Sequence, residues 1–227
     1  MIRVTENLRK IRDLLGQAAA DAGRDPASIR LLAVSKQQPV SAVLEAVAAG
    51  QQDFGENLVR EGLDKIAGVA QAGLTWHFIG RLQTNKTRPV AENFDWVHSV
   101  DRLKTAQRLS RQRPATRREL NVCLQVNLDN EPGKSGVTVD ELPELAARVA
   151  ELGRLRLRGL MCLPAIRTGF SEQRKPFARL RKLSESLNAQ GIVLDTLSMG
   201  MSADYRAAIF EGATIVRIGT AVFGERK

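Results

Sequence analysis

The feature of this sequence that most restricts its fold is a regular alternation of short apolar runs with longer helical segments. Short apolar runs are typical of strands covered on both faces, and their alternation with helices indicates a parallel sheet. The expected strands lie at 31–34, 53–54, 76–79, 96–97, 122–126, 157–161, 196–197 and 214–218. The helical segments between them span about 39–49, 56–72, 84–92, 101–112, 138–152, 172–189 and 203–211. This order predicts an α/β fold in which the strands close a (β/α)8 TIM-type barrel.

The two ends of the chain fit the same fold. Residues 3–22 have helical periodicity, so we expect an N-terminal helix preceding the first strand. The chain stops just after the last strand, and this first helix is expected to cover the barrel where a final helix is missing. No shift in composition marks a second domain, so residues 1–227 are expected to form a single domain. An open doubly wound sheet is the alternative, but no GxGxxG motif follows the first strand.

Composition narrows the class of protein. The formal net charge of +9 predicts attraction to anions, such as nucleic acid, acidic membranes or phosphorylated small molecules. No aromatic stacking motif or zinc finger accompanies the basic residues, so we expect a solvated basic surface and no nucleic-acid partner. No apolar run has the length of a membrane span, and no signal peptide is evident. Cys123 and Cys162 lie in apolar strands without a CxxC pair. We therefore expect a cytoplasmic protein with reduced, buried thiols and no membrane partner.

Functional residues of such barrels gather at the carboxyl ends of the strands. The first strand ends in Ser35 and Lys36. Burial at a barrel mouth disfavours the charged form of an amine, and a neutral amine can attack an aldehyde to form an imine. The alternative is that Lys36 forms a salt bridge or lies on the surface. The two histidines, His77 and His98, lack the spacing of metal ligands, so no metal site is expected.

The last two strands end in segments suited to an anion. Gly219 and Thr220 follow the final strand and open a short segment that could form a helical turn, whose free N–H groups and hydroxyl favour phosphate. The segment Ser198–Ser202 supplies two hydroxyls and Gly200 as the opposite wall. The alternative is that both glycines only serve tight turns. Strand alternation directs Arg217 into the same mouth, unless it forms a salt bridge to Glu56 or Glu211. A phosphate cradle, an aldehyde-reactive amine and an arginine together suggest pyridoxal phosphate.

Ordered motifs along nearly the whole chain also carry a family resemblance. They are LLAVSK (31–36), FGENLVRE (54–61), WHFIGRLQTNK (76–86), VNLDNEPGKSG (126–136), GLMCLP (159–164), SMGMSADY (198–205) and VRIGTAVFGER (216–226). With them the sequence resembles the single-domain pyridoxal-phosphate homeostasis proteins, which share a barrel with the N-terminal domain of alanine racemase.

The resemblance implies a set of cofactor-binding residues. Lys36 would form the imine with pyridoxal 5′-phosphate, and Arg217 would face the pyridine nitrogen. Two segments would bind the phosphate, and the residues that mark them are Ser198, Gly200, Ser202, Gly219 and Thr220. Asn57 and Met201 would form pocket walls. Many relatives carry a second lysine two positions after the imine lysine, where this chain has Gln38, so a role for that second amine is not expected here.

Two functions remain open at this point, besides a basic nucleic-acid-binding module, which would leave the strand-end motifs unexplained. One is a carrier, expected to be monomeric, that buffers pyridoxal phosphate or delivers it to apo-enzymes; the other is an amino-acid racemase of low activity. Racemisation needs acid/base groups on both faces of the cofactor. Relatives with that activity bring a tyrosine from a second domain, whereas the single tyrosine here, Tyr205, belongs to the SMGMSADY motif. We therefore favour the carrier, and we expect Lys134, in a glycine-flanked segment, to approach the mouth and help cofactor enter or leave, unless it is a solvated loop lysine.

Overall fold

The strands of the protein form a closed parallel barrel. The computed structural model describes residues 4–69, 73–131 and 133–224. The barrel runs in chain order from β1 to β8, and β8 pairs with β1 to close it. The strands are β1 (Arg30–Val34), β2 (Asp53–Glu56), β3 (Thr75–Phe78), β4 (Trp96–Val100), β5 (Leu120–Val126), β6 (Leu155–Cys162), β7 (Thr196–Ser198) and β8 (Ile215–Ile218). The TIM-type barrel predicted from the sequence is thus confirmed, and the open doubly wound alternative is wrong.

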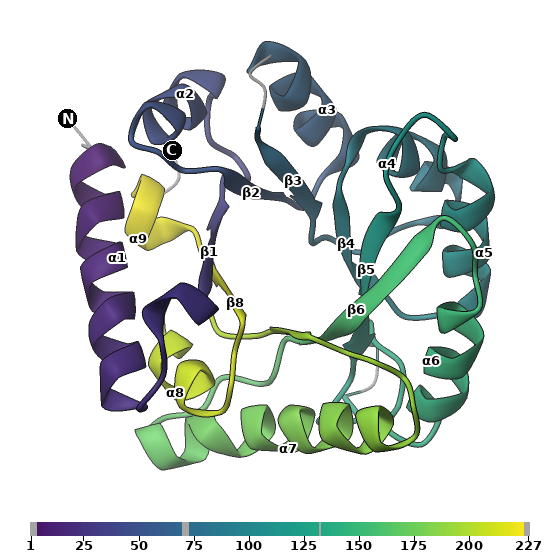
Figure 1. Cartoon of the computed structure of the whole chain (residues 1–227). Coiled ribbons are helices and arrows are strands. Elements are labelled where there is room, and N and C mark those ends of the chain that lie inside the picture. The colour runs from purple at the N-terminus through teal and green to yellow at the C-terminus, as the bar shows by residue number, and fades with distance from the viewer. Residues whose placement is uncertain (1–3, 70–72, 132, 225–227) are drawn as a thin grey trace.

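Helices surround the barrel, as Figure 1 shows. They are α1 (Val4–Asp21), α2 (Val40–Ala48), α3 (Val59–Gly68), α4 (Thr87–Asn93), α5 (Leu103–Gln112), α6 (Leu142–Ala150), α7 (Phe170–Ala189), α8 (Tyr205–Phe210) and α9 (Thr220–Phe223), with short 3-10 turns η1 (Pro26–Ser28) and η2 (Thr84–Lys86). Helix α1 precedes β1 and packs beside α8 and α9, so it covers the barrel next to the last strand as predicted.

Some element boundaries differ from the sequence prediction for local reasons. The helix expected at 56–72 begins only at Val59, because Glu56 is the buried last residue of β2; residues 70–72 lie outside the described part of the chain. The helix expected at 138–152 is assigned from Leu142. Thr138 and Glu141 form reciprocal hydrogen bonds just before it, since the Glu141 N–H and carboxylate both meet the Thr138 hydroxyl. These bonds close the turn at residues 138–141 that precedes the helix.

Two apolar clusters hold the fold together. The larger one fills the space between the strands and the helices. The smaller one lies inside the barrel and consists of Leu32, Trp96, Cys123, Met161 and Ile215. At the amino-terminal end the Arg158 guanidinium lies 4.9 Å from the Trp96 ring centroid, and that of Arg30 lies 5.9 Å from it. Such cation–π contacts close this end of the barrel.

Both cysteines are buried free thiols, as predicted. Burial raises the pKa of each thiol, Cys123 and Cys162, to about 12. A thiol with such a pKa carries almost no thiolate at neutral pH, so these cysteines serve packing and not chemistry.

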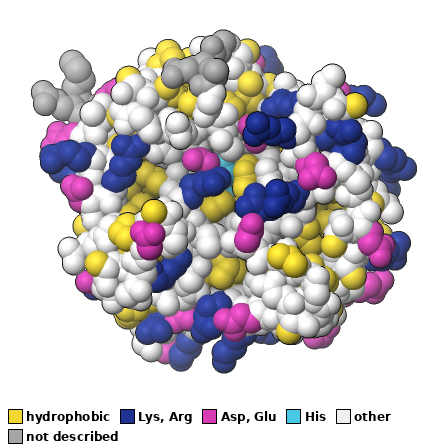
Figure 2. All heavy atoms as spheres, viewed as in Figure 1, with side chains coloured by type: hydrophobic (Ala, Val, Ile, Leu, Met, Phe, Trp, Pro, Cys, Tyr) yellow, Lys and Arg dark blue, Asp and Glu magenta, His cyan; other side chains and the backbone are white. Residues whose placement is uncertain are grey.

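The basic charge of the chain is distributed and not gathered in one patch on the face seen in Figure 2, where lysines and arginines alternate with acidic side chains around apolar areas. None of the described helices combines the length and apolar character that a membrane span requires. In the described part of the chain, no three His, Cys, Asp or Glu side chains come together in a way that could hold a metal ion.

Candidate functional site

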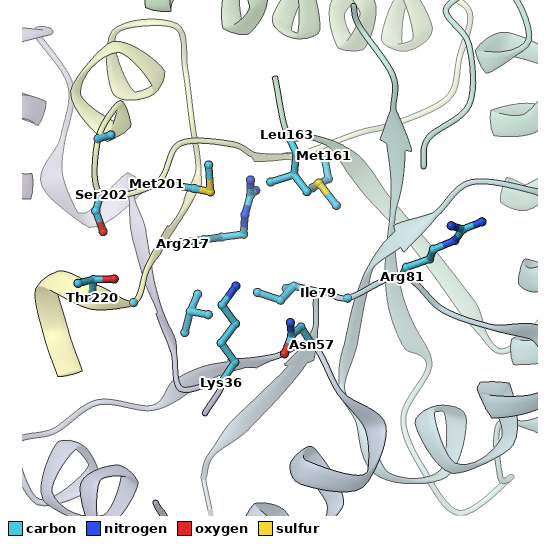
Figure 3. Close-up of a pocket in the computed structure, with 14 residues that line it drawn as sticks. Lys36, Asn57, Ile79, Arg81, Met161, Leu163, Met201, Ser202, Arg217 and Thr220 are labelled. Carbon is cyan, nitrogen blue, oxygen red and sulfur yellow. The ribbon is translucent and has the colours of Figure 1, made fainter. Parts of the chain in front are cut away.

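A cavity of about 470 Å³ opens at the carboxyl-terminal ends of the strands. It lies within the roughly 300–1,000 Å³ typical of small-molecule sites. Figure 3 shows Lys36, Asn57, Arg217, Ser202 and Thr220 arranged around it. Seven of the nine residues singled out from the sequence line this cavity: Lys36, Asn57, Met201, Ser202, Arg217, Gly219 and Thr220. The structure therefore brings β1, β2, β7 and β8 to one site, although they lie far apart in the sequence.

Lys36 is held at the end of β1 by a buried cluster of charges beneath it. The Lys65 ammonium lies 2.7 Å from Oε1 of Glu56 and 2.7 Å from Oε1 of Glu61. The Ser35 hydroxyl also donates to Glu56 at 2.5 Å. Burial raises the pKa of Glu56, against the effect of the Lys65 hydrogen bond, and its Oε2 is buried without a partner. This cluster fixes the residue immediately before Lys36.

The residue after Lys36 is constrained as well. Gln37 has a φ of 58°, an uncommon conformation for a residue other than glycine. Its N–H donates to the carboxylate of Glu61, which also accepts from Lys65. The turn that carries Lys36 is thus tied to α3 on both sides, so the lysine side chain, half-buried, extends into the cavity (Figure 3).

The loops after β7 and β8 form the opposite wall. Gly200 has a φ of +91°, and a Cβ there would lie 2.6 Å from that of Ala208, so no other residue fits without displacement. The Met201 N–H donates to Oδ1 of Asp204 at 2.7 Å, and the Arg217 N–H donates to the Gly200 carbonyl at 3.0 Å. The first bond lies within the loop after β7, and the second ties that loop to β8. Figure 3 shows the Ser202 and Thr220 hydroxyls on the same side of the cavity.

Ser198 and Gly200 do not line the cavity. Two serine hydroxyls were expected in this wall, but only that of Ser202 is there. Ser198 is the last residue of β7 and faces the barrel interior, fully buried. Its hydroxyl oxygen lies 2.8 Å from Nδ1 of His98 and accepts from the Arg217 guanidinium at 2.8 Å. Gly200 acts instead by shaping the turn.

Arg217 points from β8 toward the cavity and is only 4% exposed. Besides Ser198, its guanidinium donates to the Cys162 carbonyl at 2.9 Å. Burial lowers the pKa of Arg217, but a guanidinium stays protonated in proteins. The salt bridges considered from the sequence are not formed, because Glu56 pairs with Lys65 and Glu211 pairs with Arg174 and Arg181. In the described part of the chain Arg217 has no carboxylate within ion-pair distance.

Several wall residues were not singled out as cofactor ligands from the sequence. They are Val34, Ile79, Gly80, Arg81, Met161, Leu163 and Ala203. A Cβ at Gly80 would lie 2.1 Å from the carbonyl oxygen of Asn57, so this glycine allows the segment after β3 to approach the Asn57 backbone. Gly80 belongs to the WHFIGRLQTNK motif, which was the available signal. The Arg81 side chain extends away from the cavity (Figure 3).

Lys134 lies beside the mouth. Its ammonium pairs with Glu131, and its side chain is 46% exposed. It lines a second cavity of about 320 Å³ that shares Ile79, Arg81 and Leu163 with the first. The expectation that Lys134 approaches the mouth agrees with this position; its role in cofactor exchange stays a prediction.

Comparison with known proteins places the chain in a family. The family model described as "Alanine racemase, N-terminal domain" matches residues 3–227. A pyridoxal phosphate homeostasis protein of Pseudomonas aeruginosa is 58% identical over 226 residues, which cover 100% of this chain and 97% of that protein. The chain belongs to the pyridoxal phosphate homeostasis protein family. Its homologue from Escherichia coli is 51% identical over 98% of this chain and 97% of its own length.

Solved structures agree with this family assignment. PipY of Synechococcus elongatus, in a structure with pyridoxal phosphate bound, is 38% identical with a TM-score of 0.86, covering 97% of this chain and 100% of PipY. Alanine racemase of Corynebacterium glutamicum is only 14% identical, with a TM-score of 0.73, and this chain covers 61% of it. The racemase likeness therefore shows a shared barrel and no more.

Proposed function

We propose that this protein binds pyridoxal 5′-phosphate through an imine to Lys36, and that it buffers the cofactor or delivers it to apo-enzymes. The observation that carries the proposal is the convergence of Lys36, Arg217 and Thr220 on one cavity. The cofactor has an aldehyde for an amine, a ring nitrogen for a donor and a phosphate for hydroxyl and N–H groups. The names of the relatives and the bound cofactor of PipY support the same ligand.

The residues present fit the cofactor. Asn57 borders the cavity and its Oδ1 is buried without a hydrogen-bond partner, which is costly unless a ligand supplies one. Ser202 and Thr220 offer exposed hydroxyls for the phosphate, beside the turn that Gly200 allows. A Cβ at Gly219 would lie 3.2 Å from the Val34 carbonyl oxygen, so glycine lets the end of β8 pack closely against β1 at the edge of the cavity. Phosphate is a common ligand of the loops after the last two strands of such barrels.

Arg217 favours a site that holds the cofactor over a site that uses it to catalyse a reaction. Bound pyridoxal phosphate supplies an electron sink for amino-acid chemistry, and that sink is strongest when its ring nitrogen is protonated. A guanidinium has no acceptor and can only donate a hydrogen bond, so Arg217 would keep the ring nitrogen unprotonated. An aspartate at this position would have the opposite effect. Efficient transamination is therefore not expected of this site.

The arrangement of titratable groups also favours a carrier over a racemase. A racemase needs a proton donor or acceptor on each face of the cofactor. Among the described residues that line the cavity, Lys36, Arg81 and Arg217 are the ionisable side chains, and the two guanidinium groups stay charged. The lining therefore offers one amine but no second group of the kind that a racemase needs. Tyr205 packs against the main apolar cluster and is not part of the lining. A turnover number for alanine or serine racemisation above about 1 s⁻¹ would contradict the carrier proposal.

The proposal is tested by absorbance. Purified protein incubated with pyridoxal phosphate should become yellow, borohydride should bleach the visible band, and mass spectrometry should place the reduced adduct on Lys36. A protein that stays colourless and retains no cofactor after gel filtration would rule the proposal out. Transfer is measured separately, by reactivation of an apo-enzyme of known cofactor requirement.

A further inference from the structure

A continuous line of hydrogen-bonded side chains crosses the interior of the barrel behind Arg217. The Arg217 guanidinium lies 2.8 Å from the Ser198 hydroxyl, which lies 2.8 Å from Nδ1 of His98. Nε2 of His98 lies 2.9 Å from Nδ1 of His77. Nε2 of His77 lies 3.0 Å from Oδ1 of Asp53, at the start of β2. The line therefore connects the cofactor end of the barrel to its amino-terminal end.

The two ends of this line determine the direction of every bond in it. Arg217 can only donate and an ionised Asp53 can only accept. Both histidines are completely buried, and burial lowers the pKa of each, so both are neutral. His77 then donates through Nε2 to Asp53 and accepts at Nδ1 from His98. His98 in turn accepts at Nδ1 from the Ser198 hydroxyl. One arrangement of protons satisfies all four bonds, and each donor points away from Arg217.

This arrangement meets an electrostatic need of Arg217. The guanidinium is buried, and none of the described carboxylates lies within ion-pair distance of it. A buried charge without a partner is unfavourable. Hydrogen bonds in series polarise one another, and here the negative charge at the far end is that of Asp53, which also lies 3.3 Å from Arg30. The series of hydrogen bonds directs a lone pair of the Ser198 oxygen at the Arg217 guanidinium and so holds the plane of the guanidinium in place.

We propose that Ser198, His98, His77 and Asp53 are positioning residues, which hold Arg217 in the orientation that recognises a ring nitrogen in the cavity. The inference rests on the proposed function, since it concerns recognition of pyridoxal phosphate. It adds residues that do not touch the cavity, the farthest of which lies at the opposite end of the barrel. It also accounts for the interior position of Ser198, which separates this serine from Ser202.

The test compares His98→Met with His98→Gln in the full-length protein. Glutamine carries an NH2 donor group and a carbonyl acceptor on a side chain of nearly the same size as methionine, which carries neither of comparable strength. Each variant is titrated with pyridoxal phosphate and with the carbocyclic analogue in which a C–H group replaces the ring nitrogen. The ratio of the two dissociation constants isolates the contact with the ring nitrogen. Thermal unfolding of each protein without ligand reports its folding separately.

We expect His98→Met to lower the preference for pyridoxal phosphate over the analogue roughly tenfold, and His98→Gln to retain most of it. Equal ratios in both variants and the wild type would overturn the inference. A loss of affinity for both ligands by the same factor would also overturn it, because that result shows a structural role only. If the wild type binds neither ligand, the proposed function itself has failed, and this outcome is distinct from unchanged ratios.

A second variant decides the question if His98→Met does not fold. Asp53→Asn keeps an acceptor for His77 but removes the charge, at a site remote from the cavity. We expect the ligand preference to fall by a smaller factor, about threefold. Asp195→Asn is the matched control, because Asp195 pairs with Arg158 at the same end of the barrel but lies outside the line of hydrogen bonds. A preference that stays the same in Asp53→Asn as in Asp195→Asn would contradict the inference.

Discussion

The arginines at the two ends of the barrel have different kinds of interaction partner. At the amino-terminal end Arg158 lies 2.8 Å from Asp195 and Arg30 lies 3.3 Å from Asp53, and both cover the Trp96 ring. At the carboxyl-terminal end the described residues provide Arg217 with a hydroxyl and a carbonyl but no paired carboxylate. Charges that are satisfied within the protein stabilise a fold, whereas a buried charge with spare donors can bind a ligand. This difference favours the carboxyl-terminal end of the barrel as the proposed ligand site.

The largest effect is expected at Lys36. Lys36→Ala removes the amine that would form the imine, so the visible band and the borohydride-stable adduct should both disappear. Residual binding through the loops after β7 and β8, which would hold the phosphate, should persist at much lower affinity. Gel filtration and mass spectrometry after borohydride treatment check both points. The matched control is Lys86→Ala, because Lys86 lies on the exposed turn η2. Lys65→Met is unsuitable as a control, because Lys65 is buried in the charge cluster beside Lys36. An adduct of undiminished yield in Lys36→Ala would show that another amine reacts.

Among substitutions in the loops after β7 and β8, which would bind the phosphate, Gly200→Ala should reduce the stability of the fold the most. A side chain at a φ of +91° is strained, and its Cβ would meet that of Ala208 at 2.6 Å, so we expect a loss of about 2–4 kcal/mol in unfolding free energy. Gly50→Ala is the matched control, since Gly50 has a φ of +78° but open space around its Cβ position, and should cost about 1 kcal/mol. Urea denaturation measures both. Similar losses would show that steric contact at Gly200 is unimportant.

Arg158→Ala tests the opposite end of the barrel. Loss of its ion pair with Asp195 and its stacking on Trp96 should reduce the unfolding free energy by about 1–2 kcal/mol. The affinity for pyridoxal phosphate should stay unchanged, because Arg158 does not line the cavity. A decrease in affinity without loss of stability would contradict the division between the two ends.

The buried histidines predict an acid-sensitive fold. Burial lowers the pKa of His98 well below its ordinary value of 6.5, and that of His77 is lowered as well. As the pH falls, the unfolded chain therefore binds these protons at a higher pH than the folded protein does. The unfolding free energy has its highest value above pH 6.5 and decreases as the pH falls below it. The slope is up to about 1.4 kcal/mol per pH unit for each histidine. His98→Gln should reduce this slope in denaturation curves between about pH 5 and about pH 7.5, and an unaltered slope would exclude His98 as a cause.

The smallest effect is expected at Lys134. Lys134→Ala should leave the affinity for pyridoxal phosphate nearly unchanged but slow both loading and transfer, by a factor of about two to ten if one charge steers the phosphate. Stopped-flow absorbance measures loading, and reactivation of an apo-enzyme measures transfer. Lys175→Ala, on the exposed face of α7, controls for a general loss of positive charge. Identical rates in Lys134→Ala and the wild type would assign Lys134 to the solvated surface.

Much of the site could be predicted from the sequence because its residues directly follow recognisable strands. Lys36 follows a short apolar strand, and Gly219 and Thr220 follow another, so the rule that barrel strands end at one rim brings them together without knowledge of the packing. Ser198 marks the limit of this reasoning. Its motif places it two residues before Gly200, but whether a strand-end hydroxyl faces the rim or the barrel interior depends on where β7 ends and which neighbours accept its hydrogen bonds.

The sequence by itself determined the alternation of strands and helices, the closure of the barrel and the set of strand ends at its mouth, because these depend on periodicity and on the handed geometry of parallel strands. Only the tertiary structure decided which charges are paired. Arg30, Asp53, His77, His98 and Arg217 come from five strands, and no spacing in the sequence relates them. Their line of hydrogen bonds exists because closing the barrel directs side chains of all these strands into one narrow interior, where every polar group must find a partner.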